Sequence, residues 1–284
     1  MQGQEAKTTA PPQWADELGK KWLASLDAYE SMIASVGAAL MDRAAYGPGE
    51  RVVDIGCGGG GTTLEIGARI GPQGAAVGLD ISAALVEAAT KRARAAGRTN
   101  VQFVEGDAAS ASLPGAPFDR VFSRFGIMFF AAPAAAFAHI GTMLRSGGRA
   151  DFAVWGPPPE NHWIAATTEI VSRHIELPPR VPRAPGPFAL CEPDYVRELL
   201  ADAGFSRIAM DAWSGKVLAG GAKATPDIAA AFLLQSMSFV GALAEIDAKI
   251  RAAIAAELTE RLAGYATPGG VAMDGKAWLV TAYR

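Results

Sequence analysis

The chain has 284 residues, half of them hydrophobic and 19% charged, and its formal net charge is −3. This length allows a sizeable core in one large domain, with or without an insertion. The weak negative charge excludes a basic field of the kind that binds nucleic acid or an anionic membrane surface. Two cysteines, Cys57 and Cys191, give neither a disulfide framework nor a metal-ligand spacing, so no metal site is expected.

No signal peptide or membrane span is apparent in the sequence. Residues 1–12 are polar and lack the apolar centre of a signal peptide. The most apolar stretch, 229–244, is interrupted by polar residues and is too short to span a bilayer. A cytoplasmic protein without a membrane span is therefore expected.

The first periodic pattern runs from Trp14 to Leu40, where apolar residues recur every three or four positions. It predicts a helix that packs on the main domain. The same helix, with Trp22 and Tyr29, could instead form a lid over a substrate pocket.

Strand and helix patterns then alternate. Strands are predicted over 51–55, 75–80, 101–104, 118–123 and 149–155, and helices over 62–70, 83–96 and 133–145. Ser82 is the expected N-cap of the second helix. This alternation predicts an α/β fold with a doubly wound, mostly parallel sheet, whose ligand lies at the carboxyl ends of the strands.

After residue 155 the composition changes. Eight prolines surround a short predicted helix in 156–187, which is interpreted as an excursion over the binding edge. The later elements are predicted as a helix at 192–203, a strand at 205–213, helices at 226–243 and 244–265, and a strand at 277–283. The expected segments are a tail and lid (1–45), a binding core (46–155), a Pro-rich cap (156–190), and completion of the core (191–284) with a helical insertion (225–265).

The densest glycine cluster follows the first strand, in Asp54-Ile55-Gly56-Cys57-Gly58-Gly59-Gly60-Gly61. Glycines are needed where a turn demands unusual dihedrals and a ligand approaches the backbone. Gly56-x-Gly58-x-x-Gly61 fits the dinucleotide pattern, and Asp54-x-Gly56-x-Gly58-x-Gly60 fits that of S-adenosylmethionine (AdoMet) methyltransferases. The glycines alone do not decide between them.

Five motifs in order are decisive. They are Val52–Gly60, Gly78–Ser82, Glu105–Ala108, Phe118–Ser123 and Leu144–Gly148. With them the chain resembles a class I AdoMet-dependent methyltransferase, closely over residues 48–155, and its character is similar to the quinone and sterol branch with its bacterial small-molecule relatives. The resemblance implies a Rossmann-like fold with a seven-stranded sheet, in which N-terminal helices and a helical insertion form a cap.

The resemblance also implies AdoMet as cofactor and a role for each matching residue. Gly56, Gly58 and Gly60 would let the backbone approach the methionine part, with Asp54 organising the turn and the cofactor's amino group. Asp80 would accept from both ribose hydroxyls, since an ionised acceptor makes the stronger bond. The remaining cofactor-binding residues would be Cys57, Ile81, Gly106, Asp107, Ala108, Ser123 and Arg124, with Asp107 accepting from the adenine amino group.

Recognition of the methyl acceptor is expected from the apolar, aromatic variable parts of the chain. They suggest a hydrophobic or aromatic small molecule, and the candidate contacts are Trp22, Tyr29, Phe125, Met128 and Trp163, with Trp14, Phe129 and Phe232 nearby. Of three histidines, His162 follows the fifth strand directly and is the candidate general base. The helices of the insertion are interpreted either as a substrate lid or as a homodimer contact.

Other functions remain open at this point. A domain that binds AdoMet or another nucleoside without methyl transfer would keep all the cofactor positions. An NAD(P)-dependent oxidoreductase shares the glycines and Asp80, but no Tyr-x-x-x-Lys pair is found. A nucleic-acid methyltransferase is disfavoured, because neither an Asn-Pro-Pro-Tyr-type motif nor a basic cleft signature occurs.

Overall fold

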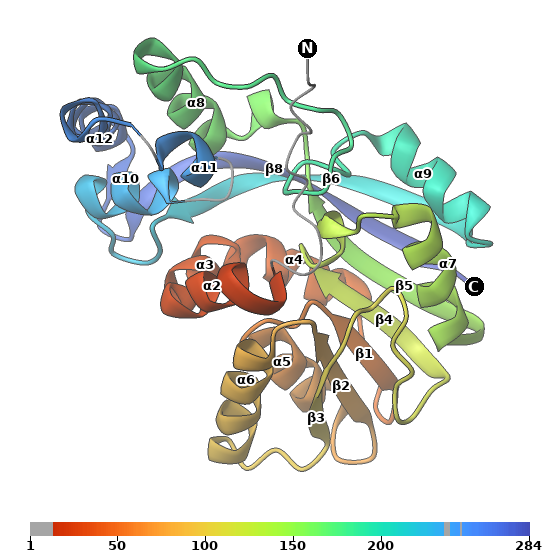
Figure 1. Cartoon of the computed structure of the whole chain (residues 1–284). Helices are drawn as coiled ribbons and strands as arrows, with labels where there is room; N and C mark the ends of the chain where they lie inside the picture. The colour runs from red at the N-terminus through yellow and green to blue at the C-terminus, as the bar shows by residue number, and fades with distance from the viewer. Residues whose placement is uncertain (1–13, 236–238, 245) are drawn as a thin grey trace.

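The computed structural model describes residues 14–235, 239–244 and 246–284. Figure 1 shows a twisted sheet with helices on both faces, a second group of helices at the upper left, and short N-terminal helices between the two. The expected Rossmann-like fold is confirmed.

The sheet has the strand order β3-β2-β1-β4-β5-β8-β6, and a two-residue strand, β7, pairs with β8. The bounds are β1 Arg51–Ile55, β2 Ala75–Asp80, β3 Val101–Glu105, β4 Phe118–Arg124, β5 Leu144–Trp155, β6 Ser206–Ala219, β7 Ala266–Thr267 and β8 Gly270–Tyr283. β1 to β5 pair in parallel, whereas β8 enters antiparallel between β5 and β6. The order reverses between β1 and β4, so the carboxyl ends of these strands form the crevice where such sheets bind ligands.

Helices cover both faces of this sheet. α4 (Ala34–Ala44), α5 (Gly61–Ile70) and α6 (Ala83–Ala95) lie on one face, and α7 (Pro133–Met143) and α9 (Pro193–Asp202) on the other. Val52, Val53 and Ile55 of β1 are at most 1% exposed, as expected for a central strand covered on both sides. β5 begins at Leu144 rather than at residue 149, because Leu144 already pairs with Phe118 before a register shift.

The expected single helix over Trp14–Leu40 is wrong in its continuity. One π-helical turn, Trp14–Leu18, is followed by α2 (Gly19–Ala24), α3 (Leu26–Met32) and α4. Ser25 (φ −121°) and Ile33 (φ −99°) leave helical geometry, so the chain bends twice over the top of the sheet. Periodicity alone does not reveal such breaks, because each short helix keeps the same apolar spacing.

The hairpin of β6 and β8 is longer than the strands expected at 205–213 and 277–283. Its far end carries the second helical group, α8 (His162–His174), α10 (Pro226–Leu234), α11 (Val240–Leu243) and α12 (Ala248–Ala263). The helix expected at 226–243 ends at Leu234. Residues 236–238 of that expected helix, and residue 245 of the helix expected at 244–265, lie outside the described residues. Two short 3₁₀ turns, Ile127–Phe129 and Pro158–Glu160, follow β4 and β5.

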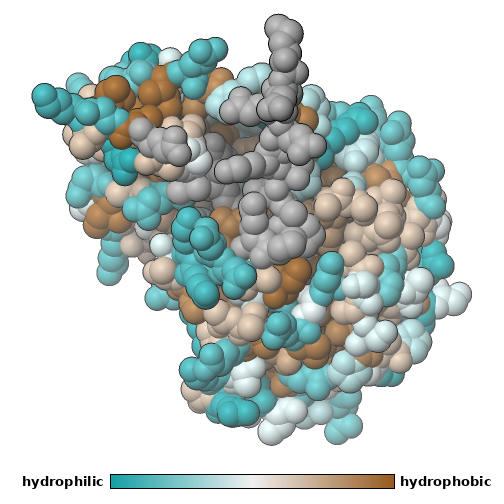
Figure 2. Space-filling view, viewed as in Figure 1, coloured by the Kyte–Doolittle hydropathy of each residue, from teal (hydrophilic) through white to brown (hydrophobic). Residues whose placement is uncertain are grey.

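The second helical group buries most of its apolar side chains. Figure 2 shows hydrophilic residues over much of the outline of one face, with hydrophobic ones gathered over α8 and α12. Among the described large hydrophobic residues, Val181, Ile228 and Ile250 are the exposed ones, at 56%, 52% and 37%. No helix within the described ranges is long and apolar enough to cross a membrane. The expected homodimer contact stays a prediction.

The close contact between Gly126, just after β4, and the end of β1 leads to a first prediction. A Cβ on Gly126 would lie 2.5 Å from the Ile55 carbonyl oxygen and 2.8 Å from Gly56 Cα, and both are backbone atoms that cannot move aside cheaply. Gly126→Ala is expected to lower the free energy of unfolding by about 1–3 kcal/mol, measured by urea denaturation. Gly47→Ala is the control, because the nearest atom to its new Cβ is 3.9 Å away. Equal stability of the two variants would contradict the prediction.

Candidate active site

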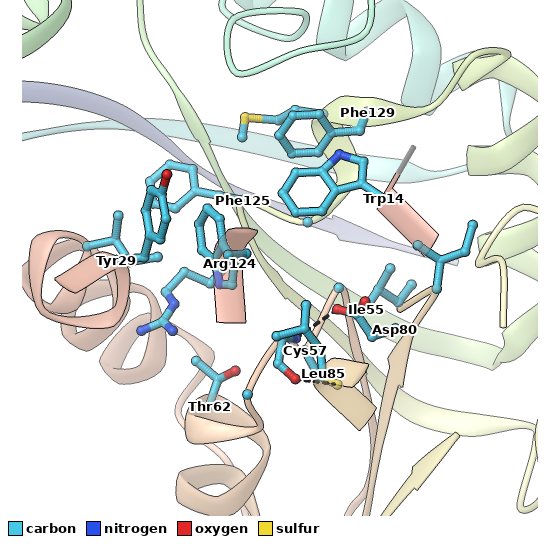
Figure 3. A pocket seen from close by; sticks show the side chains of 18 of the residues that line it. Trp14, Tyr29, Ile55, Cys57, Thr62, Asp80, Leu85, Arg124, Phe125 and Phe129 are labelled. Atoms are coloured by element: carbon cyan, nitrogen blue, oxygen red, sulfur yellow. Dashed lines mark hydrogen bonds between the residues drawn. The ribbon is translucent and has the colours of Figure 1, made fainter. Parts of the chain in front are cut away.

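A cavity of about 1510 Å³, counted with its open mouth, lies over the carboxyl ends of β1, β2, β3 and β4. Its floor is the glycine turn after β1, its roof is the segment of residues 14–32 (here the lid segment), and α10 closes one side. Figure 3 shows side chains from these elements converging from above and below.

The glycine turn needs its glycines for different reasons. Gly56, Gly58 and Gly60 have φ values of 66°, 55° and 80°, in the left-handed region that side chains disfavour. Gly56 and Gly58 line the cavity. A Cβ on Gly60 would instead meet Phe103 at 2.7 Å and Ala89 at 2.8 Å. Gly60 therefore lets α5 pack against the sheet and α6 and does not lie among the cavity residues.

Asp80, at the end of β2, is fixed by two backbone donors. Gly58 N–H donates to Oδ2 at 2.8 Å, and Ser82 N–H donates to Oδ1 at 3.0 Å. Burial raises the pKa of Asp80 against the lowering effect of these bonds. Ser82 occupies the expected N-cap position of α6 but makes no side-chain cap bond, and its hydroxyl is buried without a partner. Asp80 thus holds the first turn of α6 by the Ser82 backbone and still borders the cavity.

Asp54, at the end of β1, lies behind the turn and not in the cavity wall. Its Oδ2 accepts from the Thr62 and Thr63 hydroxyls at 2.6 and 2.7 Å, which anchors the start of α5. Its Oδ1 is buried and has no partner among the described residues. Burial raises the pKa of Asp54 to about 6, even though the two hydroxyls lower it.

The loop after β3 forms the far end of the cavity. Gly106, Asp107 and Ala108 line it together with Ile81 and Leu85. Oδ1 of Asp107 accepts from Ala109 N–H at 2.8 Å, which fixes the carboxylate in an Asx turn. This end therefore combines apolar surface with one oriented acid.

Ser123 and Arg124 are adjacent at the end of β4, but only Arg124 lines the cavity. Ser123 is fully buried and donates to the Ile55 carbonyl at 2.7 Å, so it ties β4 to β1 and does not line the cavity. Arg124 does line it, and its guanidinium forms no hydrogen bond or ion pair with any described residue. Its side chain lies over Gly37 of α4, where a Cβ would sit 3.0 Å from Nη1. Burial lowers its pKa, against the charge of Asp54.

Aromatic side chains of the lid segment close the cavity from above. Trp22 stacks on Tyr29 with ring centroids 3.9 Å apart, and Tyr29 contacts Phe232 of α10 at 4.6 Å. Trp14 meets Phe129 edge-on at 4.9 Å, as Figure 3 shows. The Trp22 indole nitrogen lies 3.6 Å from where a Cβ on Gly58 would be, so the lid rests directly on the glycine turn.

The wall that continues from β4 and β5 is also aromatic. Phe125 stacks on Trp155 at 4.2 Å, and Trp155 contacts Trp163 of α8 at 5.4 Å. Phe125 has a φ of 63°, which is strained for a bulky residue. Its N–H donates to the Ala153 carbonyl at 3.0 Å. Together with Met128, these residues line the cavity.

His162 is not among the cavity residues. Its ring is 45% exposed and lies 3.5 Å from Asp274 on β8. The neighbouring Asn161 explains this position, because its buried amide binds the Gly156 and Pro157 carbonyls and accepts from Lys276 N–H, which turns Trp163 inward and His162 outward. The proposed role of His162 as a base has no support in this geometry.

The other histidines also lie outside the cavity. His139 is half-buried, and its Nε2 lies 3.0 Å from the Ala111 carbonyl oxygen. His174 lies 2.8 Å from Glu257 of α12.

Sequence reasoning missed an ion pair that fastens the lid segment. Arg92 of α6 donates to Glu30 at 2.9 Å, to the Gly59 carbonyl at 3.1 Å and to Asp27 at 3.2 Å. Glu30 also lines the cavity. Glu30 and Arg92 are 62 positions apart in the chain. Nothing in local spacing brings them together, so only the tertiary fold reveals the contact.

The chain is similar to known methyltransferases over the part that contains the glycine turn. A methyltransferase domain model matches residues 52–148. The chain is 33% identical to an aklanonic acid methyltransferase of Streptomyces sp. strain C5, over 41% of this chain and 53% of that protein. It is 31% identical to a demethylmenaquinone methyltransferase of Deinococcus radiodurans, over 49% of this chain and 56% of that protein. The chain thus spans about half the length of each of these relatives.

A solved structure extends the likeness to the whole fold. Phosphoethanolamine N-methyltransferase 2 of Haemonchus contortus, in complex with S-adenosyl-L-methionine, superimposes with a TM-score of 0.59 at 18% identity, covering 97% of this chain and 60% of that one. The domain match, the relatives and the fold agree with the five sequence motifs. Residues 52–148 thus match a methyltransferase domain, and the chain resembles class I AdoMet-dependent methyltransferases that act on quinones and other small molecules.

Proposed function

We propose that this protein transfers a methyl group from AdoMet to a small hydrophobic or aromatic acceptor and releases S-adenosylhomocysteine. The observation that carries the proposal is the pair of acids around the cavity. Asp80 is oriented by Gly58 and Ser82, and Asp107 is oriented by Ala109. They stand at the ends of neighbouring parallel strands, as the sugar and base of one bound nucleoside require.

The residues present fit AdoMet from end to end. Asp80 has free lone pairs for the ribose hydroxyls, and Asp107 keeps Oδ2 for the adenine amino group, with Ile81 against the ring. The bare backbone of Gly56 and Gly58 admits the methionine chain. At the methionine end the cavity holds two opposite charges, Arg124 and Glu30.

Those charges suit the ends of an amino acid. Arg124 has no protein partner, so its guanidinium is free for the cofactor carboxylate. Glu30 can accept from the amino group. Oδ1 of Asp54 has no hydrogen-bond partner among the described residues, and its negative charge below the turn would attract the positively charged amino group of the cofactor.

When bound, AdoMet supplies an electrophilic methyl carbon on a positively charged sulfur. The chain's residues then have to position the acceptor, exclude water and orient the attack. The lid segment covers the glycine turn through Trp22, and Arg92 fastens it through Glu30. The stacked pairs Trp22–Tyr29 and Phe125–Trp155 offer flat apolar faces to the acceptor.

A calorimetric titration separates this proposal from a dinucleotide-binding function. Sinefungin should bind with a clear signal and NADH should give none. The antiparallel β8 between β5 and β6 also favours AdoMet, because the dinucleotide-binding fold has the strand order 3-2-1-4-5-6 without such an inserted strand. A panel of phenols, quinols, amines and acids, assayed for S-adenosylhomocysteine release, separates an enzyme from a protein that only binds the nucleoside.

Removing the Asp80 carboxylate should cost affinity for the cofactor. Asp80→Ala is expected to raise the Kd for sinefungin by roughly 10- to 100-fold, because hydrogen bonds to a charged group contribute about 1.5–3 kcal/mol. Asp274→Asn, at a half-exposed acid on β8, is the control and should bind normally. Unchanged affinity in a folded Asp80→Ala protein would remove the main support for the proposal.

His162→Ala should keep turnover close to that of the wild type. The ring lies outside the cavity and faces Asp274, so its loss removes no group from the reacting atoms. Steady-state kcat and the Kd for sinefungin are the measurements. A fall of about a hundredfold in kcat with unchanged nucleoside affinity would restore the base assignment made from the sequence.

The pKa of Asp54 predicts a pH dependence of stability. It rises from 3.8 to about 6 on folding. A raised carboxyl pKa gives stability that is present below the unfolded value and is lost as the pH rises through the folded value. Relative to Asp54→Asn, the wild type should therefore lose about 2 kcal/mol of unfolding free energy between about pH 4 and pH 7. Urea denaturation of both proteins at several pH values tests this, and parallel curves would contradict it.

A further inference from the structure

The part of the cavity beyond the cofactor residues is almost entirely apolar. Met32, Ile33, Phe125, Met128, Phe129 and Trp155 line it. This part would hold the acceptor, so its chemistry limits which acceptors can react. The inference that follows rests on the proposed function and specifies its substrate class.

Side chains that could remove a proton are missing from this apolar part, as far as the described residues show. All three histidines lie elsewhere, as shown above. Three carboxylates line the cavity, and each belongs to its cofactor end. Asp80 and Asp107 are bonded to backbone N–H groups, and Glu30 is paired with Arg92 beside Gly59.

Tyr29 does not fill this role either. Burial raises the pKa of its hydroxyl, so the phenol stays protonated at neutral pH and can only donate a hydrogen bond. Arg124 is the one cation among the described lining residues. Arg124 lies at the cofactor end and would bind the cofactor carboxylate, so the positive sulfur of the bound cofactor is the charge that would attract an anionic acceptor. The cavity offers no group that would create the anion.

We infer that the methyl acceptor is an aromatic oxygen acid that enters the cavity already ionised, as a carboxylate or as an enolate or phenolate of similar acidity. Ordinary phenols and protonated amines would arrive with a proton on the nucleophile and find no group to take it. Water is a weak base at neutral pH and would not replace such a group.

The step balances without a base. A lone pair of the anionic oxygen forms the new O–C bond to the methyl carbon, and the C–S bond breaks with its electron pair going to sulfur. One negative and one positive charge disappear together, giving a neutral ester or ether and a neutral thioether. No proton is released, which matches a cavity with no proton acceptor at the reacting end. In apolar surroundings the two charges attract strongly before transfer, so the acid should bind best after the charged cofactor.

The test compares ligands of one shape and different charge on the full chain. The protein is loaded with sinefungin, in which a carbon replaces the sulfur and carries a cationic amine in place of the methyl group, or with S-adenosylhomocysteine, whose sulfur is neutral. 2-Naphthoate, neutral 2-naphthamide and cationic 2-naphthylmethylamine are then titrated by calorimetry. 2-Naphthoate should bind the sinefungin complex at least tenfold more tightly than the S-adenosylhomocysteine complex. It should also bind at least tenfold more tightly than either other ligand.

The outcomes separate the inference from the proposed function. If neither nucleoside binds, the proposed function fails and the inference with it. If a nucleoside binds but 2-naphthoate shows no preference for the charged complex, or binds no better than the amide or amine, the inference alone is overturned.

Methylation rates of an ionised and a protonated acceptor test directly whether the cavity lacks a general base. 2-Hydroxy-1,4-naphthoquinone, which is ionised at neutral pH, should be methylated with a kcat/KM that is flat across neutral pH. 2-Naphthol should react at least a hundredfold more slowly. Efficient methylation of 2-naphthol that is abolished in Glu30→Gln would identify Glu30 as a base and overturn the inference. Asp27→Asn is the matched control, because it weakens the same Arg92 contact without removing a carboxylate from the cavity.

Discussion

The hydrogen bond from Gly58 N–H to the Asp80 carboxylate joins the turn after β1 to the end of β2 at 2.8 Å. Parallel pairing of Asp54 with Gly78 and of Ile55 with Leu79 brings the two strand ends to the same level. The left-handed φ of Gly58, 55°, turns its N–H toward the acid. Because a second backbone donor, from Ser82, fixes the other oxygen, the carboxylate has one orientation. Trp22 of the lid segment lies against the same glycine. The glycine turn, Asp80 and the lid segment therefore all meet at Gly58.

The cofactor half of the site could be predicted from the sequence because its residues follow strands. Chemistry at the ends of β1, β2 and β3 is set by the strand pattern and the glycines, and parallel pairing brings Asp80 and the loop with Asp107 to one edge. The roof could not be predicted in the same way. The breaks at Ser25 and Ile33 and the contact of Glu30 with Arg92 depend on long-range packing, which leaves no periodic trace in the sequence.

His162 lies at the strand end where the sequence predicted it, but the next residue along the chain enters the cavity in its place. The end of β5 does lead to the cavity, and the side chain that enters it is Trp163. Three hydrogen bonds of the buried Asn161 amide decide which neighbour points inward, and one partner is Lys276 on β8, 115 positions away. Sequence order placed the histidine at the correct strand end. The side on which it lies depends on a tertiary contact, and the same contact makes the wall aromatic where a base was expected.

The distribution of charge in the cavity gives the cofactor and the acceptor separate ends. Glu30, Asp80, Asp107 and Arg124 lie with the glycine turn and the neighbouring loops, whereas Phe125, Met128 and Trp155 form an apolar surface beyond them. Under the proposed function, a zwitterionic nucleoside would satisfy its charges at the first end, and its reacting carbon would point toward the second. Orientation of the methyl group would then follow from where the cavity is polar, and the protein would promote an in-line attack without a side chain that acts on the acceptor chemically.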